Sequence, residues 1–284
     1  MWSPEYCTCT HDSLKISHGK WYWSNRGIGG RMALDYLIKV RGLEFVSVVQ
    51  VLCGYTPPPQ AARPALRPTT LFRFPAASRY PSAVVFYLQG LGIDPEIIYA
   101  CLEAGILYES RRYQNCVFVR RDPSGQPRSA ALRGTKDGFK RDVKGRDKQY
   151  ACLPVADSAC PRLAVAESPI DALSLATLEK RSGGLWRSCH YLSLGGTALR
   201  VLLQFLKDHP NVTQVSLFLD NGRAGMDGMD RLERAIREDA VLAAQVTLLC
   251  RNPPPGEYGK DYNDFLTALI RLARSQSYRR EEVR

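Results

Sequence analysis

The C-terminal part of the chain alternates between apolar strand-like runs and helix-like stretches, and this order restricts the fold more than any other feature. The strand-like runs are LAVAE, HYLSLGG, QVSLFLD and QVTLLCR, and the helix-like stretches between them are PIDALSLATLEKR, TALRVLLQFLKDH and GMDRLERAIRED. Strands that alternate with helices form a parallel sheet covered by those helices. The pattern predicts an α/β domain with right-handed crossovers, which we assign to residues 159–274.

The chain before this domain divides into three further sections. A proline-rich stretch at 56–71 disfavours helix and sheet, so we predict a linker there. Residues 1–55 combine short alternating stretches with two helix-like patterns. Residues 72–158 contain two predicted helices and a hairpin in which a DPSG turn joins VFV to SAALR. We therefore expect a small N-terminal domain, a linker and an α+β middle domain.

Charge and composition indicate which binding partners and which cellular compartment to expect. The 284 residues carry a formal net charge of +11, which favours nucleic acid as a partner, with an acidic membrane surface or simple solubility as alternatives. No run has the roughly 18 apolar residues of a membrane span. The first residues lack the basic and apolar regions of a signal peptide. Because the nine cysteines are mostly scattered singly, we expect reduced thiols in a cytoplasmic protein.

Acidic residues follow three strands of the predicted sheet, at the edge where α/β proteins bind ligands. Glu167 follows the first strand, Asp220 ends the third, and Asp261 comes after the fourth. Mg²⁺ takes oxygen ligands, and carboxylates gathered at one edge repel one another unless a cation neutralises them. The sequence therefore predicts a metal site at this edge. The alternative is that each acid only caps a helix or a turn.

A glycine pair ends the second predicted strand. Gly195 and Gly196, followed by Thr197, precede the next predicted helix. Glycines let a phosphate approach the backbone at a helix N-terminus, so these three residues are candidates for phosphate binding. A tight turn with Thr197 as the N-cap residue is the alternative, and the two interpretations are compatible.

Basic side chains gather between the middle section and the α/β domain. The segment from Lys136 to Lys148 contains six Lys or Arg residues. We expect this segment to follow a phosphate backbone, with a solvated loop as the alternative. The full set of candidate nucleic-acid-binding residues is Arg133, Lys136, Lys140, Arg141, Lys144, Arg146, Lys148 and Lys260.

Three motifs together resemble a Toprim domain, the catalytic domain of DnaG-type primases, topoisomerases and some nucleases. They are AESPIDALSLATL, LDNGRAG and KDYNDFL, and their form is similar to the variety found in primase-like proteins of plasmids and conjugative elements. The middle section, with NCVFVRRD and SAALRGT, resembles the uncharacterised domain that often precedes this variety. KWYWSNRGIGGRMALDYLIKVRGLEF resembles a primase zinc-binding domain.

The resemblance implies a function in DNA replication or in transfer of a mobile genetic element. Glu167 and Asp220 would be catalytic, with Glu167 as general base or metal-linked acid. Asp220 and Asp261 would hold Mg²⁺ or Mn²⁺. The partner would be single-stranded DNA or another nucleic acid, with replication proteins beside it. Two alternatives stay open: a catalytically eroded module that only binds single-stranded DNA or a replication partner, and a Toprim-type nuclease.

Two departures from the family pattern qualify these expectations. The Cys-x-x-Cys pair of the zinc domain should fall at Trp23 and Arg26, and neither residue binds zinc. We therefore expect no zinc, and an aromatic core of Trp21, Tyr22 and Trp23 in its place, with base stacking as the alternative.

The second departure is Gly222, which stands where the Toprim pattern has its second Asp. Asp261 could supply the missing carboxylate, and Asp227 is a weaker candidate nearby. One metal ion is expected rather than two.

Overall fold

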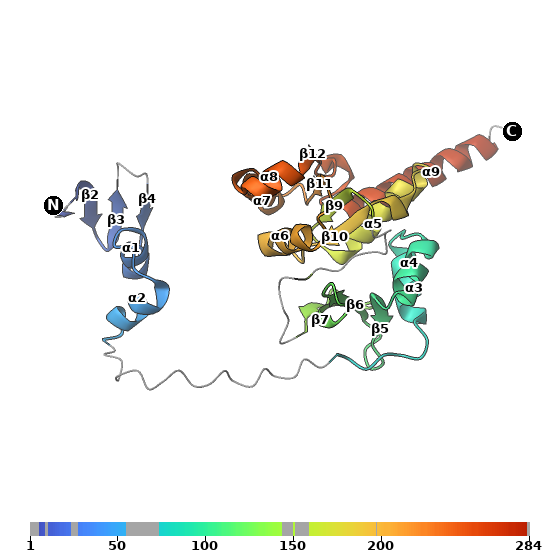
Figure 1. Cartoon of the computed structure of the whole chain (residues 1–284), viewed down its shortest axis with the longest axis horizontal. Helices are drawn as coiled ribbons and strands as arrows, with labels where there is room; N and C mark the ends of the chain where they lie inside the picture. The colour runs from blue at the N-terminus through green and yellow to red at the C-terminus, as the bar shows by residue number, and fades with distance from the viewer. Residues whose placement is uncertain are drawn as a thin grey trace. The chain divides into compact units, whose positions relative to one another are not determined.

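The computed structural model describes residues 6–8, 11–23, 28–54, 74–143, 150, 159–196 and 198–282. The chain forms two compact units, Met1–Arg67 and Pro68–Arg284 (Figure 1). None of the helices in the described ranges is long and apolar enough to cross a membrane.

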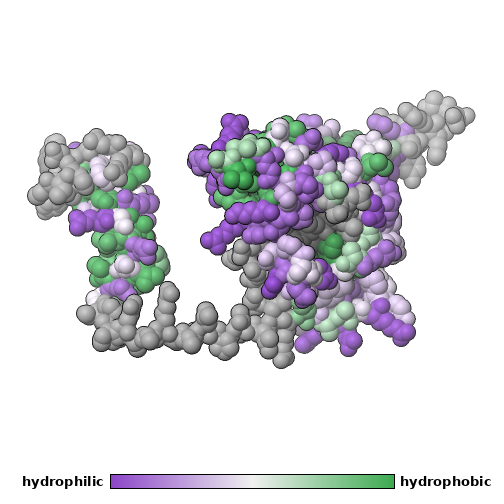
Figure 2. Space-filling model, viewed as in Figure 1, coloured by the Kyte–Doolittle hydropathy of each residue, from purple (hydrophilic) through white to green (hydrophobic). Residues whose placement is uncertain are grey.

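The first unit is an antiparallel four-stranded sheet followed by two helices. Its elements are β1 (Tyr6–Thr8), β2 (His11–Ser17), β3 (Lys20–Trp23), β4 (Ile28–Gly30), α1 (Ala33–Lys39) and α2 (Phe45–Leu52), with the strands in chain order across the sheet. Apolar side chains remain exposed on α2, where Phe45 and Val46 are 61% and 64% exposed (Figure 2).

Strand alternation decides which aromatic side chains form the core of this unit. Trp21 and Trp23 are buried with Leu14, which confirms their predicted core role. Tyr22 lies between them and is 54% exposed, so its prediction as a core residue was wrong. Successive side chains of a strand point to opposite faces, and three consecutive residues cannot all enter one core.

The second unit begins with two helices and an antiparallel sheet. These elements are α3 (Ser82–Gly90), α4 (Pro95–Glu103), β5 (Leu107–Glu109), β6 (Cys116–Arg121), β7 (Pro127–Arg133) and β8 (Lys140–Asp142). The hairpin predicted from the DPSG turn is confirmed as β6 and β7, with Phe118 opposite Ala131. The sheet order is β5-β6-β7-β8.

The rest of the second unit is the α/β domain, and its predicted fold class is confirmed. Its elements are β9 (Arg162–Ala166), α5 (Pro169–Arg181), β10 (His190–Ser193), α6 (Leu199–Asp208), β11 (Gln214–Phe218), α7 (Arg223–Glu238), α8 (Ala240–Gln245), β12 (Thr247–Arg251) and α9 (Tyr262–Glu282). The strands are parallel in the order β10-β9-β11-β12.

Helices cover both faces of the parallel sheet. One core joins inward-facing strand residues such as Val165 to α6, α7 and α8. The other joins Ala164 and Ala166 to α5 and α9, and continues without a break into Leu88 and Ile97 of α3 and α4. The helical part of the middle section and the α/β domain therefore share one hydrophobic core, although the sequence predicts them as separate domains.

Polar contacts reinforce this junction. The Lys180 ammonium on α5 lies 2.7 Å from Asp94 Oδ1 and 2.8 Å from Glu96 Oε2, both at the start of α4. The Trp186 indole N–H donates to Glu96 Oε1 at 2.9 Å. These contacts hold α4 against α5 and so fix the middle section relative to the parallel sheet.

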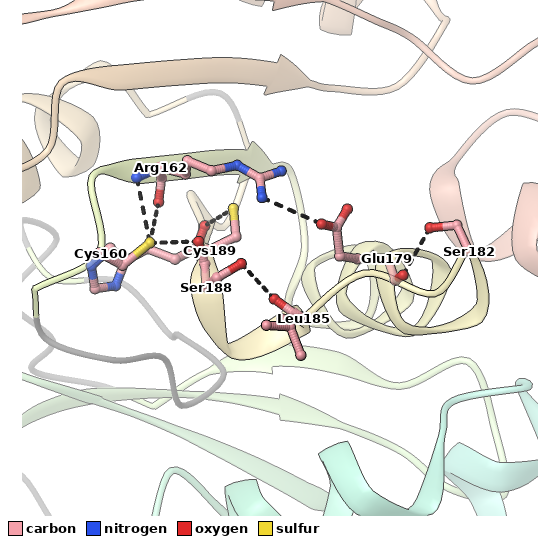
Figure 3. A network of polar contacts seen from close by, with 8 residues as sticks. Cys160, Arg162, Glu179, Ser182, Leu185, Ser188 and Cys189 are labelled. Carbon is pink, nitrogen blue, oxygen red and sulfur yellow. Dashed lines mark hydrogen bonds and ion pairs between the residues drawn. The ribbon is translucent and has the colours of Figure 1, made fainter.

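A separate network holds the start of β9, at the end of the strand away from Glu167 (Figure 3). Arg162 Nη1 donates to Glu179 Oε1 of α5 at 3.4 Å. The Cys160 thiol donates to the carbonyl of Ser188 at 2.7 Å. Side-chain contacts thus hold the first residue of β9, and Glu167 follows the opposite end of the same strand.

Candidate functional site

The carboxyl ends of the parallel strands form one wall of a cleft of about 520 Å³. Glu167 follows β9, Asp220 follows β11, and Asp261 stands before α9, and all three line this cleft. The three acids predicted to meet at the carboxyl edge of the sheet therefore lie in one site. Asp227 lies outside the cleft lining, on the exposed side of α7, where it pairs with Arg223 at 3.9 Å.

The carboxylates of this wall influence one another. Burial raises the pKa of Glu167, and the nearby charges of Asp220 and Asp261 raise it further. Burial also raises the pKa of Asp220, while the Lys260 ammonium, 3.3 Å from Asp220 Oδ2, lowers it. Acids in this state favour a bound cation, because a cation removes both the repulsion and the cost of burial.

Asp171 is a fourth acid of the wall that the sequence did not single out. It is 4% exposed, and its Oδ2 accepts a hydrogen bond from Ser168 Oγ at 2.6 Å. Burial, followed by the charge of Asp261, raises the pKa of Asp171 to about 7. The signal that could have revealed it is its place in the first turn of the helix that starts directly after Glu167, at the edge of the sheet where α/β proteins bind ligands.

The hydrogen bonds test the alternative that these acids only cap helices. Ser168 caps α5 by accepting from the amide of Asp171 at 3.2 Å, so Glu167 is not the cap. Gly222 is the N-cap residue of α7, which begins at Arg223, so Asp220 is not the cap of this helix. Asp261 does accept from the amide of Asp264 at 2.8 Å, so this carboxylate also stabilises the start of α9.

Backbone contacts fix the acids in place. Asn221 Nδ2 donates to the carbonyls of Pro254 and Gly259, and its amide donates to the carbonyl of Lys260 at 3.1 Å. These bonds tie the loop that carries Asp261 to the end of β11. Gly225 allows α7 to pack closely, since a Cβ at this position would lie 2.1 Å from the Asp220 carbonyl oxygen and 2.9 Å from Glu167 Oε1.

The opposite wall of the cleft is basic. It is formed by the sheet of the middle section, whose cations there are Arg120, Arg133, Lys140 and Arg141, with Asp142 as the acid among them. The wall of parallel strand ends has four acids and one cation, Lys260. A cleft with one acidic and one basic wall attracts a metal ion to the first and phosphate groups to the second.

The predicted nucleic-acid-binding residues divide into three groups. Arg133, Lys140, Arg141 and Lys260 line the cleft. Lys136 is described but lies outside the cleft lining. The remaining three, Lys144, Arg146 and Lys148, lie outside the described residues.

The predicted phosphate-binding turn borders the same cleft. Gly195 and Gly196 have φ angles of +67° and +115°, which favour glycine, and both line the cleft. The amide of Gly196 already donates to the carbonyl of Glu167 at 2.9 Å. Ala198 is the N-cap residue of α6, and Thr197 lies outside the described residues.

The donor set of the acidic wall fits Mg²⁺. Its ligand atoms are carboxylate oxygens, the type that Mg²⁺ takes, and Glu167 Oε1 is buried without a hydrogen-bond partner among the described residues. Nowhere in the described part of the chain do three or more His, Cys, Asp or Glu side chains already stand in a metal-binding arrangement. The expectation of no zinc in the first unit stays a prediction, because the side chains of its N-terminal Cys7, Cys9 and His11 lie outside the described residues.

Comparisons with known proteins agree with this architecture. Residues 164–266 match a family described as Toprim-like, so the C-terminal domain is Toprim-like, as the motifs predicted. Residues 87–156 match a family described as a protein of unknown function (DUF3991), which confirms the resemblance of the middle section to an uncharacterised domain. A search of the curated proteins found no match.

Solved structures of primases are similar over most of the chain. The primase fragment of the bacteriophage T7 primase-helicase protein is 17% identical, with 92% of this chain and 93% of that chain covered and a TM-score of 0.46. The Aquifex aeolicus primase with its zinc-binding and RNA polymerase domains is 16% identical, with 95% and 78% covered and a TM-score of 0.42. A DnaG primase catalytic domain bound to ssDNA is 17% identical, with 69% and 71% covered and a TM-score of 0.45.

Proposed function

We propose that the protein is a primase-like Toprim protein that acts on DNA through metal-dependent phosphodiester chemistry. The observation that carries this proposal is the cleft itself, in which an acidic wall with Glu167, Asp171 and Asp220 faces a basic wall with Arg133 and Lys140. The Toprim-like family match supports the same function. A role in replication or transfer of a mobile genetic element, with single-stranded DNA as the partner, rests on the motif resemblance.

Each wall would have its own task. Asp220 and Asp261 would hold Mg²⁺ or Mn²⁺, which when bound would neutralise charge that develops on a phosphodiester oxygen. Glu167 would accept the proton of the attacking hydroxyl, and its raised pKa suits a general base better than that of an exposed glutamate. The basic wall would orient the phosphates of the nucleic acid or nucleotide.

A second candidate is a module that binds single-stranded DNA without catalysis. Gly222 favours it, because the second Asp of the Toprim pattern is replaced there. The Lys260 ammonium favours it too, since it already pairs with Asp220.

The decisive measurement is Mg²⁺- or Mn²⁺-dependent primer synthesis and nicking on single-stranded DNA. Glu167→Gln should abolish the activity and leave salt-sensitive DNA binding intact. Glu179→Gln is the matched control, because Glu179 is an acid of the same domain outside the cleft that bonds Arg162. Synthesis supports a primase, nicking supports a nuclease, and DNA binding without either activity leaves the binding module.

A further inference from the structure

Arg120 is an almost fully buried cation in the basic wall. Its side chain is 4% exposed, and its Nη1 lies 3.2 Å from Asp142 Oδ1. Its Nε is buried without a hydrogen-bond partner among the described residues. A guanidinium keeps its charge and offers five N–H donors in a fixed plane. Because its ion-pair partner Asp142 is itself partly exposed, the desolvated guanidinium retains capacity to bind an anion.

The guanidinium lies against the glycine turn of the opposite wall. A Cβ at Gly195 would stand 2.8 Å from Arg120 Nη2, so this close approach requires glycine there. Gly195, Gly196 and Arg120 all line the cleft, and the two glycines have no side chains to cover the guanidinium. Arg120 therefore reaches across the cleft to the glycine turn of the opposite wall.

Two further buried polar atoms lie on β7 and β10, close in sequence or in strand pairing to Arg120 and Gly195. Ser129 stands opposite Arg120 in the β6–β7 pairing, and Ser193 lies two residues before Gly195. The hydroxyls of both serines are buried without a hydrogen-bond partner among the described residues. Hydroxyls donate as well as accept, so the strands beside Arg120 and Gly195 carry donors without acceptors. At Arg120 itself a group with several acceptor oxygens matches the unused donors of the guanidinium, and water is the competing occupant.

We propose that Arg120 and the Gly195–Gly196 turn form a phosphate-binding subsite of the cleft. The inference rests on the proposed function, because the phosphate would belong either to a nucleoside triphosphate or to the strand being copied. Arg133 and Lys140 continue the same basic wall. A phosphate held by Arg120 would face Glu167 and Asp220 across the cleft. The subsite thus assigns a task to Arg120 that neither the motifs nor the charge pattern indicated.

The test is titration calorimetry of the full chain with two probes, inorganic triphosphate and a single-stranded oligonucleotide, without divalent metal. Arg120→Met should weaken binding of one probe by at least about tenfold, the effect of losing charge-assisted hydrogen bonds. Arg121→Met is the matched control, because the Arg121 guanidinium bonds the carbonyls of Gly125 and Gly105 and does not line the cleft.

The pattern of losses identifies the source of the phosphate. A loss with triphosphate alone assigns the subsite to the nucleotide, and a loss with the oligonucleotide alone assigns it to the copied strand. If Arg120→Met binds both probes as the Arg121→Met control does, water fills the subsite and the proposal is overturned. If the unaltered chain binds neither probe, the proposed function fails with the subsite. Arg120-dependent binding in a chain that neither synthesises primers nor nicks DNA refutes the proposed function alone.

A second pair of variants decides the matter if Arg120→Met does not fold. Asp142→Asn frees the guanidinium from its acid and should tighten binding of the same probe by roughly threefold or more. Asp137→Asn is the control, since Asp137 is an acid before β8 that accepts from the amide of Phe139 and lies outside the cleft lining. Equal affinities in these two variants would count against the subsite.

Discussion

Lys260 occupies the space beside Gly222: a Cβ on Gly222 would lie 3.4 Å from Lys260 Cε, an ordinary contact. The same lysine pairs with Asp220 at 3.3 Å. The position where the Toprim pattern has its second acid is thus next to a cation that already neutralises the first. Lys260 therefore offsets part of the negative charge of the acidic wall. A substitution at Gly222 or at Lys260 should alter metal binding.

Gly222→Asp should tighten Mn²⁺ binding by roughly tenfold, because a carboxylate would join Asp220 as an oxygen ligand. Gly222 has φ −74° and ψ 163°, an extended conformation that any residue adopts, so the backbone accepts the change. The measurement is the fraction of free Mn²⁺ by electron paramagnetic resonance. Gly222→Asn is the control of equal size without charge. Equal affinities in the two variants would show that a carboxylate at position 222 adds no metal ligand.

Lys260→Met should also tighten Mn²⁺ binding, by a factor on the order of three, because it removes the ammonium that competes for Asp220. The factor is small because the Lys260 side chain is 69% exposed and solvent screens its charge. Lys136→Met is the control, as Lys136 lies outside the cleft lining. Weaker Mn²⁺ binding in Lys260→Met than in the control would mean that the lysine supports the metal site instead.

Asp171 should make stability depend on pH. Its folded pKa of about 7 is above the ordinary value of an aspartate, near about 4, so the folded chain keeps a proton that the unfolded chain has released. The free energy of unfolding therefore falls as the pH rises between these values and levels off above about 7. The slope is at most about 1.4 kcal/mol per pH unit.

The asparagine of Asp171→Asn does not ionise, so the free energy of unfolding of this variant lacks the pH dependence of Asp171. Its stability relative to the unaltered chain should therefore grow from pH 4 to pH 7. Urea unfolding in the presence of a chelator measures the difference. Asp227→Asn, at an exposed acid of α7, should show no such trend. A pH-independent difference for Asp171→Asn would mean that the burial of this carboxyl costs nothing in the folded chain.

Gly225→Ala should destabilise the second unit by about 1–3 kcal/mol, the usual range for overpacking. The added methyl would collide with the Asp220 carbonyl, a backbone atom that cannot move away cheaply. Gly222→Ala should have little effect, because its Cβ meets only the flexible Lys260 side chain. Urea unfolding of both variants checks the prediction, and equal stabilities would show that α7 can shift to admit the methyl.

The sequence predicted the parallel sheet because its strands are apolar runs separated by amphipathic helices. It missed β5 and β8, which have three residues each and show no measurable period. It also missed α8, whose six residues AVLAAQ lie between a longer helix and a strand. Short elements are stabilised by their neighbours, and this information is absent from the local pattern.

The candidate site was predictable only in part for the same reason. Glu167 and Asp220 are visible because parallel strands end at one edge. Asp171 was not singled out, because an acid in the first turn of a helix is common for reasons of helix stability. Arg120 is one of two adjacent arginines in a strand, and only the fold shows that it is buried while Arg121 is not.

The core shared by α3, α4 and α5 has a consequence for the evolution and engineering of this chain. Ile97 of α4 and Ala172 of α5 belong to one hydrophobic cluster, so the sheets that form the basic wall and the acidic wall pack on the same core. Exchanging the middle section or the α/β domain for that of a relative would therefore require new core residues in both. The cleft should therefore be inherited as a single module, and transplanting it would require the whole stretch from residue 74 to the first turns of α9.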